Sequence, residues 1–127
     1  MDVLLVDDNT DYLLPMKEAL YQHGYTVYAA DDGRQACRIM GAAKVDLIIS
    51  DIKMPNFDGI QLHQVARDMK EYAKTKFVFI SGYRDAYSDK LDLNPDRDYF
   101  IDKTMAAQDI IKFIDQLMFG KYAEVWV

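Results

Sequence analysis

The stretch Val45-Asp46-Leu47-Ile48-Ile49-Ser50-Asp51-Ile52-Lys53-Met54-Pro55 decides the fold. It is an apolar run of strand length that reaches Asp51, after which the chain breaks at Met54-Pro55 and turns through Asp58-Gly59. A nearly continuous apolar strand is typical of a parallel sheet that is covered on both faces. Because ligands bind outside the carboxyl ends of such strands, Asp51 is expected at the edge of the sheet where chemistry takes place.

The rest of the chain alternates between short apolar segments and segments with helical spacing. The pattern predicts further strands at 3–6, 25–29, 77–80 and 99–101. It predicts helices at about 10–23, 34–43, 58–73 and 106–119, with Asn9 or Thr10 as the first cap. This alternation indicates an α/β fold, with a doubly wound, five-stranded parallel sheet and right-handed crossovers. The expected strand order is 2-1-3-4-5.

Two segments depart from the regular pattern. Pro15 stands inside the first predicted helix, where a missing amide hydrogen is tolerated mainly in the first turn, so we expect an irregular or late helix start. Residues 86–91 have the spacing for two helical turns before Asn94-Pro95 ends them. We assign residues 1–120 to one domain and residues 121–127 to a tail of unknown role.

Composition narrows the class of protein. The 127 residues are enough for one domain with a core, and the formal net charge of -6 argues against direct binding of nucleic acid. The single cysteine, Cys37, excludes an internal disulfide and a multi-cysteine zinc site. Met1 is not followed by a signal peptide, and no apolar run is long enough to cross a bilayer. We therefore expect a cytoplasmic protein that does not bind membranes.

Polar residues stand at the carboxyl ends of four predicted strands: Asp7 and Asp8, Asp51, Ser81 and Lys103. In a parallel sheet these ends meet at one crevice. Three carboxylates repel each other unless a cation joins them, and oxygen ligands without histidine or cysteine select Mg²⁺ or a similar ion such as Mn²⁺. A lysine and a hydroxyl group beside such an ion form a site for a phosphoryl group. Since the chain has no glycine-rich nucleotide loop, that group must come from elsewhere.

With these residues the chain resembles the receiver domains of bacterial two-component response regulators, in particular chemotaxis-regulator-like ones. The resemblance covers residues 3–119 and rests on Asp7-Asp8, Asp51 with Met54-Pro55 and Asp58-Gly59, Ser81-Gly82, and Lys103. It implies a flavodoxin-like receiver fold and a phosphoacceptor switch in signal transduction. Such a protein is a regulator rather than an enzyme, because it catalyses its own phosphotransfer and autodephosphorylation and turns over no free substrate.

The resemblance implies a role for each acidic residue. Asp51 would take a phosphoryl group from the phosphohistidine of a sensor histidine kinase or a phosphotransfer protein. Asp8, Asp51 and the backbone carbonyl of Lys53 would hold Mg²⁺, with Asp7 helping through water.

The remaining roles concern the response to phosphorylation. Lys103 would pair with one phosphoryl oxygen, and the Ser81 hydroxyl would bind another. The movement of Ser81 would let Phe100 turn inward and change the face that a downstream protein or output domain recognises. A homodimer formed on phosphorylation is a further expectation.

Two residues depart from the family pattern. Lys103 is followed by Thr104, where the family usually has proline after a cis peptide bond. Because a cis bond before another residue costs about 2.5–4 kcal/mol, we expect a trans bond here. Tyr83, two residues past Ser81, stands where the family tunes dephosphorylation, and Tyr83→Ala is expected to speed the loss of phosphate.

Alternatives remain at this stage. The chain could be a receiver-like module that binds proteins without phosphorylation, because Thr104 misplaces Lys103. A phosphoaspartate hydrolase of the haloacid dehalogenase type would need a second aspartate where Lys53 stands. A receiver could act alone, or it could be part of a larger regulator or hybrid kinase. His63 is expected to be a surface or boundary residue rather than a phosphorelay histidine.

Overall fold

The computed structural model describes residues 1–82 and 93–120. Within these residues five parallel strands form one sheet in the order β2-β1-β3-β4-β5. The strands are β1 (Asp2–Val6), β2 (Thr26–Ala30), β3 (Leu47–Asp51), β4 (Lys76–Ser81) and β5 (Asp98–Asp102). The predicted fold class and strand order are therefore confirmed.

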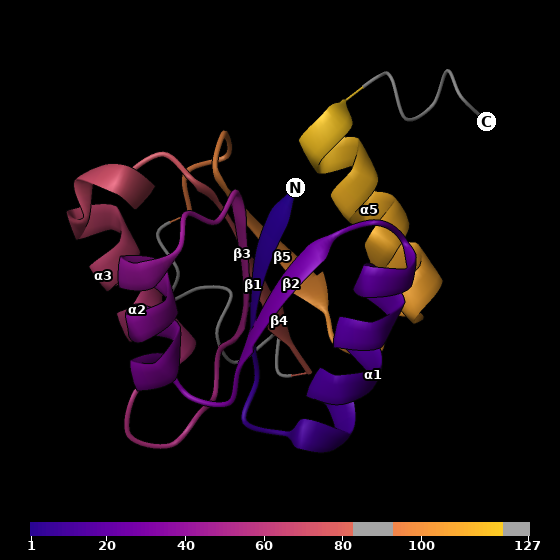
Figure 1. Cartoon of the computed structure of the whole chain (residues 1–127), viewed down its shortest axis with the longest axis horizontal. Coiled ribbons are helices and arrows are strands. Elements are labelled where there is room, and N and C mark those ends of the chain that lie inside the picture. Colours follow the sequence, from indigo (N-terminus) through magenta and orange to yellow (C-terminus); the bar gives the residue numbers. More distant parts are fainter. Residues whose placement is uncertain (83–92, 121–127) are drawn as a thin grey trace.

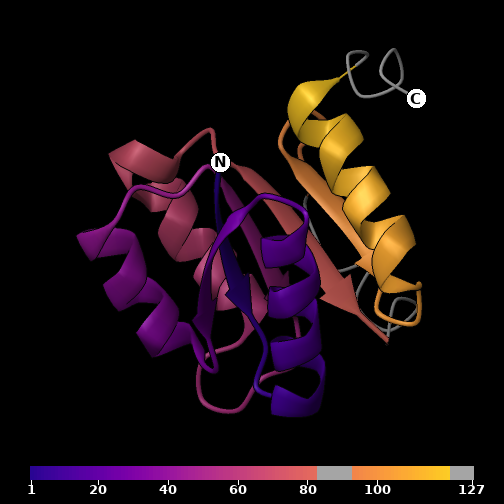
Figure 2. The same cartoon turned by 45° about the vertical axis from the view of Figure 1, so that its right-hand side comes forward.

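Helices cover both faces of the sheet (Figures 1 and 2). One face carries α1 (Thr10–Gln22) and α5 (Ala107–Phe119), and the other carries α2 (Gly33–Ala42), α3 (Gly59–Asp68) and the short 3-10 helix η1 (Lys70–Tyr72). None of the helices in 1–82 and 93–120 is long and apolar enough to cross a membrane.

The core consists of two layers, one on each side of the sheet. In β1, Val3 and Leu5 pack in the layer beneath α1 and α5, whereas Leu4 and Val6 pack in the layer beneath α2 and α3. All five residues of β3 are buried. This double burial explains why β3 is apolar almost throughout, since a strand covered on both faces has no solvent side on which to place polar residues.

Helix α1 begins at Thr10 in a regular way, so the expected irregular or late start is wrong. The Asn9 side chain accepts a hydrogen bond from the backbone of Asp11 and caps the helix. Pro15 lies inside the helix on its exposed side, while the apolar residues of the opposite face, Leu13, Met16 and Leu20, are buried. Their burial offsets the local cost of a proline within the helix.

Helix α3 ends at Asp68, earlier than the predicted end near residue 73. Met69 has an extended backbone, and the chain then enters η1. The buried Tyr72 side chain donates hydrogen bonds to the Met40 and Ala43 carbonyls at the end of α2, so tertiary contacts set this boundary. The predicted turns at 86–91 and Tyr83 lie outside the described residues.

Candidate functional site

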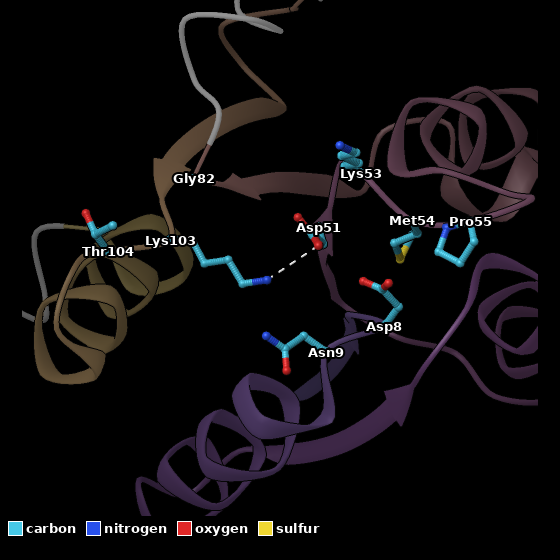
Figure 3. A pocket seen from close by; sticks show the side chains of 9 residues that line it. All are labelled: Asp8, Asn9, Asp51, Lys53, Met54, Pro55, Gly82, Lys103 and Thr104. Carbon is cyan, nitrogen blue, oxygen red and sulfur yellow. Dashed lines mark hydrogen bonds and ion pairs between the residues drawn. The ribbon is translucent and has the colours of Figure 1, made fainter.

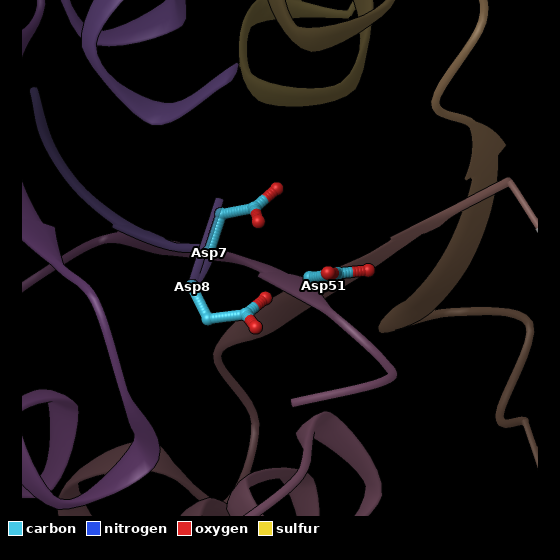
Figure 4. Close-up of side chains that lie close together, drawn as sticks. All are labelled: Asp7, Asp8 and Asp51. Atoms are coloured by element: carbon cyan, nitrogen blue, oxygen red, sulfur yellow. The ribbon is translucent and has the colours of Figure 1, made fainter. Parts of the chain in front are cut away.

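Three carboxylates meet at the carboxyl edge of the sheet (Figure 4). Asp51 is the last residue of β3, and Asp7 and Asp8 follow β1 directly. An oxygen from each of the three lies within 4.8 Å of the other two. Asp7 is fully buried and Asp51 is 7% exposed, whereas Asp8 faces solvent. The structure thus brings together the acidic residues that the sequence places at the ends of two neighbouring strands.

Backbone groups orient the two buried carboxylates. The Asn9 amide donates to Asp7 Oδ1 at 2.9 Å, and the Ile52 amide donates to Asp51 Oδ1 at 2.9 Å. In each carboxylate the Oδ2 atom faces Lys103 instead. One oxygen of each group is therefore held by its own loop, and the other is directed into the site.

Lys103 reaches this edge from the segment after β5 (Figure 3). Its Nζ atom lies 2.8 Å from Asp7 Oδ2 and 3.4 Å from Asp51 Oδ2, so the ion pair with Asp7 is the closer one. The backbone amide of Lys103 donates to the Ser81 carbonyl at 3.1 Å, which ties the end of β5 to the end of β4. Lys103 therefore bridges three of the strands that form the site.

The peptide bond after Lys103 is trans, and hydrogen bonds from Thr104 to Asp102 hold the backbone there. The described residues contain no cis bond, so the predicted trans bond between Lys103 and Thr104 is confirmed. The Thr104 amide and hydroxyl both donate to Asp102 Oδ1, at 2.8 and 2.7 Å. This local turn holds the segment in place of the proline that the family usually has there.

The charges of the site perturb one another. Burial, together with the Asp7 carboxylate, raises the pKa of Asp51 to about 6, although Lys103 acts in the opposite direction. Burial would lower the pKa of Lys103, but the hydrogen bond to Asp7 and the charge of Asp51 raise it above its ordinary value. Burial and a neighbouring negative charge both disfavour the ionised form of a carboxyl group. A bound cation would stabilise that ionised form.

A pocket of about 760 Å³ opens in front of the carboxylates (Figure 3). Its lining comes from several loops and comprises Asp8, Asn9, Asp51, Lys53, Met54, Pro55, Gly82, Lys103 and Thr104. The pocket thus holds Asp8, Asp51, Lys53 and Lys103 from the predicted site, with Asp7 buried behind them.

The two residues predicted to form the switch, Ser81 and Phe100, do not line this pocket. Ser81 is fully buried at the end of β4, next to the pocket residue Gly82. Phe100 on β5 is half-buried against the core layer beneath α2 and α3. The structure therefore places Ser81 directly before a residue of the pocket, and neither Ser81 nor Phe100 is among the residues that line it.

Tyr12 is a neighbour of the site that sequence reasoning missed. Its ring lies with its centroid 4.7 Å from Lys103 Nζ. Its hydroxyl is buried without a hydrogen-bond partner among residues 1–82 and 93–120. Burial, followed by the charges of Asp7 and Asp51, raises the pKa of this hydroxyl. The sequence carries no signal for this contact beyond the place of an aromatic residue in the first turn of α1.

The donor atoms fit a hard divalent cation. Three carboxylates contribute oxygens, and neither histidine nor cysteine is among the residues that line the pocket or lie behind it. Such a donor set suits Mg²⁺, which commonly binds one or two carboxylates together with waters and phosphate oxygens. A cation here would also offset the burial and the repulsion from Asp7 that together raise the pKa of Asp51.

Comparisons with known proteins agree with this geometry. A family model described as the response regulator receiver domain matches residues 3–115. The chain is 39% identical over 92 residues to the sensor kinase CckA of Brucella abortus, covering 70% of this chain but 10% of that protein. It is 36% identical over 84 residues to a probable chemotaxis protein CheY of Rhizobium etli, covering 65% of each.

A solved structure shows the same arrangement of the chain. The response regulator TrrA of Thermotoga maritima, crystallised in complex with Mg²⁺ and BeF, superimposes with a TM-score of 0.77 at 25% identity. The match covers 91% of this chain and 97% of that one. The aligned part of this chain spans a tenth of the length of CckA and about two thirds of the length of the CheY protein. The similarity to CckA is therefore confined to one segment of that protein.

Proposed function

Because the chain belongs to the response regulator receiver domain family, we propose that it is a phosphoacceptor switch that takes its phosphoryl group on Asp51. The observation that carries the proposal is the position of Asp51. It is a buried carboxylate with one oxygen held by the Ile52 amide and the other directed at Lys103 beside an open pocket.

The chemistry is a transfer between a phosphohistidine and a carboxylate. An Asp51 oxygen attacks the phosphorus, the bond from phosphorus to the imidazole nitrogen breaks, and its electron pair returns to that nitrogen. The Lys103 ammonium lies close enough to Asp51 to neutralise charge on a phosphoryl oxygen. The buried Ser81 hydroxyl would bind another oxygen of the product. The acyl phosphate is later lost to water at the same site.

Mg²⁺ would be held by Asp8, Asp51 and the Lys53 carbonyl, with Asp7 helping through water. When bound, the ion neutralises the charge of the carboxylates and of the phosphoryl oxygens. The clustering of three carboxylate oxygens within 4.8 Å supports this assignment, and Mn²⁺ is expected to substitute. TrrA, which matches nearly the whole chain, was crystallised with Mg²⁺ and BeF.

The partners follow from the reaction. The donor would be a sensor histidine kinase or a phosphotransfer protein, and the recipient of the signal a downstream protein or output domain. The relatives include sensor kinases and a CheY protein, which supports this class of pathway. Inward rotation of Phe100 on phosphorylation would change the exposed face around β5, and a phosphorylation-dependent homodimer is an expected consequence.

The test is direct phosphorylation in vitro. The protein is incubated with Mg²⁺ and acetyl phosphate, and its intact mass is followed with and without EDTA. We expect the mass of one phosphoryl group to appear, to require the divalent ion and to disappear on treatment with hydroxylamine, which cleaves acyl phosphates. Asp51→Asn should not be labelled, whereas the exposed Asp68→Asn on α3 should behave as wild type.

The alternative is a receiver-like module that binds proteins without phosphate. Its basis is the position of Lys103, which is closer to Asp7 than to Asp51 and is followed by threonine. The 3.4 Å approach to Asp51 favours the phosphoacceptor instead. A wild-type protein that gains no mass from acetyl phosphate and does not bind beryllofluoride would establish the alternative.

A further inference from the structure

We propose that the ring of Tyr12 positions the Lys103 ammonium for phosphoryl transfer to Asp51. This inference rests on the proposed function and adds a residue to it. Tyr12 stands in the first turn of α1, and its amide donates to the Asn9 carbonyl at 3.1 Å. Its backbone is therefore fixed by the same loop that orients Asp7.

Among the described residues, the Lys103 ammonium has two carboxylates and one aromatic ring as neighbours. Two are carboxylate oxygens, at 2.8 Å on Asp7 and 3.4 Å on Asp51. The third is the ring of Tyr12, whose centroid is 4.7 Å away. A cation within about 6 Å of an aromatic centroid is attracted by the electrons of the ring face. The lysine is thus held by two anions and one neutral surface.

Of these neighbours, the two carboxylates change their charge during the proposed reaction. Asp51 becomes an acyl phosphate, and Asp7 would share its charge with the divalent ion. The ring of Tyr12 keeps its character throughout, so it is the contact that persists while Lys103 shifts from carboxylate to phosphoryl oxygen. A lysine side chain needs such a guide because it carries several freely rotating bonds.

The ring, rather than the hydroxyl, carries this role. The hydroxyl makes no hydrogen bond within the described part of the chain and does not line the pocket. Tyr12→Phe keeps the ring and removes the hydroxyl, so it should preserve the rate of phosphorylation within about twofold. Tyr12→Leu keeps an apolar side chain without a ring, and its rate should fall by roughly five- to thirtyfold.

The measurement is the rate of phosphorylation by acetyl phosphate at saturating Mg²⁺, read by intact mass. Tyr21→Leu is the matched control, since Tyr21 is on the same helix but 65% exposed. It should retain the wild-type rate. Affinity for Mg²⁺, measured by calorimetry, should change little in Tyr12→Leu, because the ring acts on the lysine and contributes no metal ligand.

A double-mutant cycle with Lys103→Met shows whether Tyr12 acts through the lysine. In the Lys103→Met background, Tyr12→Leu should cause no further loss of rate. The proposal is overturned if Tyr12→Leu is phosphorylated as fast as wild type, or if it slows the reaction equally in both backgrounds. Either result leaves Asp51 as phosphoacceptor intact, whereas an unlabelled wild-type protein would remove both proposals.

Fluorinated phenylalanines at position 12 provide a test that does not depend on the fold of Tyr12→Leu. Fluorine withdraws electrons from the ring face while nearly preserving its shape. The rate should fall stepwise as fluorines are added to phenylalanine at this position. A rate that is independent of fluorination would overturn the positioning role.

Discussion

Gly59 packs directly against the backbone carbonyl of Asp51. A β-carbon at position 59 would lie 2.1 Å from the Asp51 carbonyl oxygen. The Gly59 amide donates to the Ile52 carbonyl at 2.8 Å, so the first residue of α3 is joined to the end of β3. The position of the proposed phosphoacceptor thus depends on a close contact between two backbones, and glycine is the residue that permits it.

Gly59→Ala should therefore damage both stability and phosphorylation. The obstructing atom belongs to the backbone and cannot rotate away, so α3 or the end of β3 must shift. Overpacking of this kind costs about 1–3 kcal/mol. We expect a loss of that size in urea unfolding, together with slower labelling of Asp51 by acetyl phosphate.

Gly41→Ala is the control for this substitution. Gly41 lies in α2, and a β-carbon there would meet nothing within 4 Å. Alanine in an exposed helix position is preferred over glycine by about 0.5–1 kcal/mol. This variant should be slightly more stable than wild type, and equal behaviour of the two alanine variants would refute the backbone contact at Gly59.

Removal of the Asp51 charge should stabilise the metal-free protein at neutral pH. Burial and Asp7 raise the pKa of Asp51 to about 6, so the folded protein binds this proton more tightly than the unfolded chain does. The contribution of Asp51 to stability is therefore present below about pH 4 and is lost as pH rises through about 6. At pH 7 we expect Asp51→Asn to be more stable by about 1–3 kcal/mol.

Thermal unfolding with and without metal tests this prediction. The advantage of Asp51→Asn should shrink between pH 6 and about pH 4, where the wild-type carboxyl takes up its proton. Added Mg²⁺ should stabilise wild type more than the variant, because the ion then has one carboxylate more to bind. A variant that is less stable than wild type at pH 7 without metal would contradict the assignment.

Lys103→Met should bind Mg²⁺ more tightly while it is phosphorylated more slowly. The ammonium lies 2.8 Å from Asp7 Oδ2 and competes with a divalent cation for the same negative charge. Loss of a partly exposed ion pair of about 1 kcal/mol corresponds to roughly fivefold tighter binding. Calorimetry measures the affinity, and the mass assay measures the rate. Weaker Mg²⁺ binding in the variant would show that Lys103 and the ion do not compete.

The architecture of the chain could be predicted from local patterns because each strand carries its own signal. The run at 45–51 is apolar on both faces, and the acids and the lysine that define the site follow strands directly in the sequence. The sequence predicts an irregular or late start of α1 because it shows only the local cost of Pro15. The burial of Leu13, Met16 and Leu20 beneath the helix decides the outcome, and it depends on the packed sheet.

The contacts within the site between residues far apart in the sequence could not be predicted. The preference of Lys103 for Asp7 over Asp51 depends on distances across three strands, and the contact with Tyr12 joins residues at opposite ends of the chain. The sequence favours a surface or boundary position for His63, whose side chain is 17% exposed, but the pairing of His63 with Asp98 has no signature in the sequence. Such pairs arise from packing rather than from periodicity.

The buried Asp98 carboxylate should stabilise the end of the sheet away from the site through its hydrogen bonds and its ion pair with Arg67. Its Oδ1 accepts from Arg67 at 2.6 Å and lies 2.9 Å from His63 Nε2, and its Oδ2 accepts from the Asn94 amide at 2.9 Å. Although burial acts to raise the pKa of Asp98, the Asn94 amide, Arg67 and His63 hold it below its usual value. Asp98→Asn should cost about 3 kcal/mol at pH 7, because it leaves the partly buried Arg67 without its anion.

The pH dependence separates this ion pair from a simple packing defect. A carboxyl with a lowered pKa stabilises the fold above the ordinary value of about 4, and this stabilisation is lost as pH falls through the folded value. The difference between wild type and Asp98→Asn in chemical unfolding should therefore narrow below pH 4. Asp96→Asn, at an exposed neighbouring position, should match wild type throughout. A difference that stays constant from pH 7 to pH 3 would mean that shape, and not charge, is what Asp98 contributes.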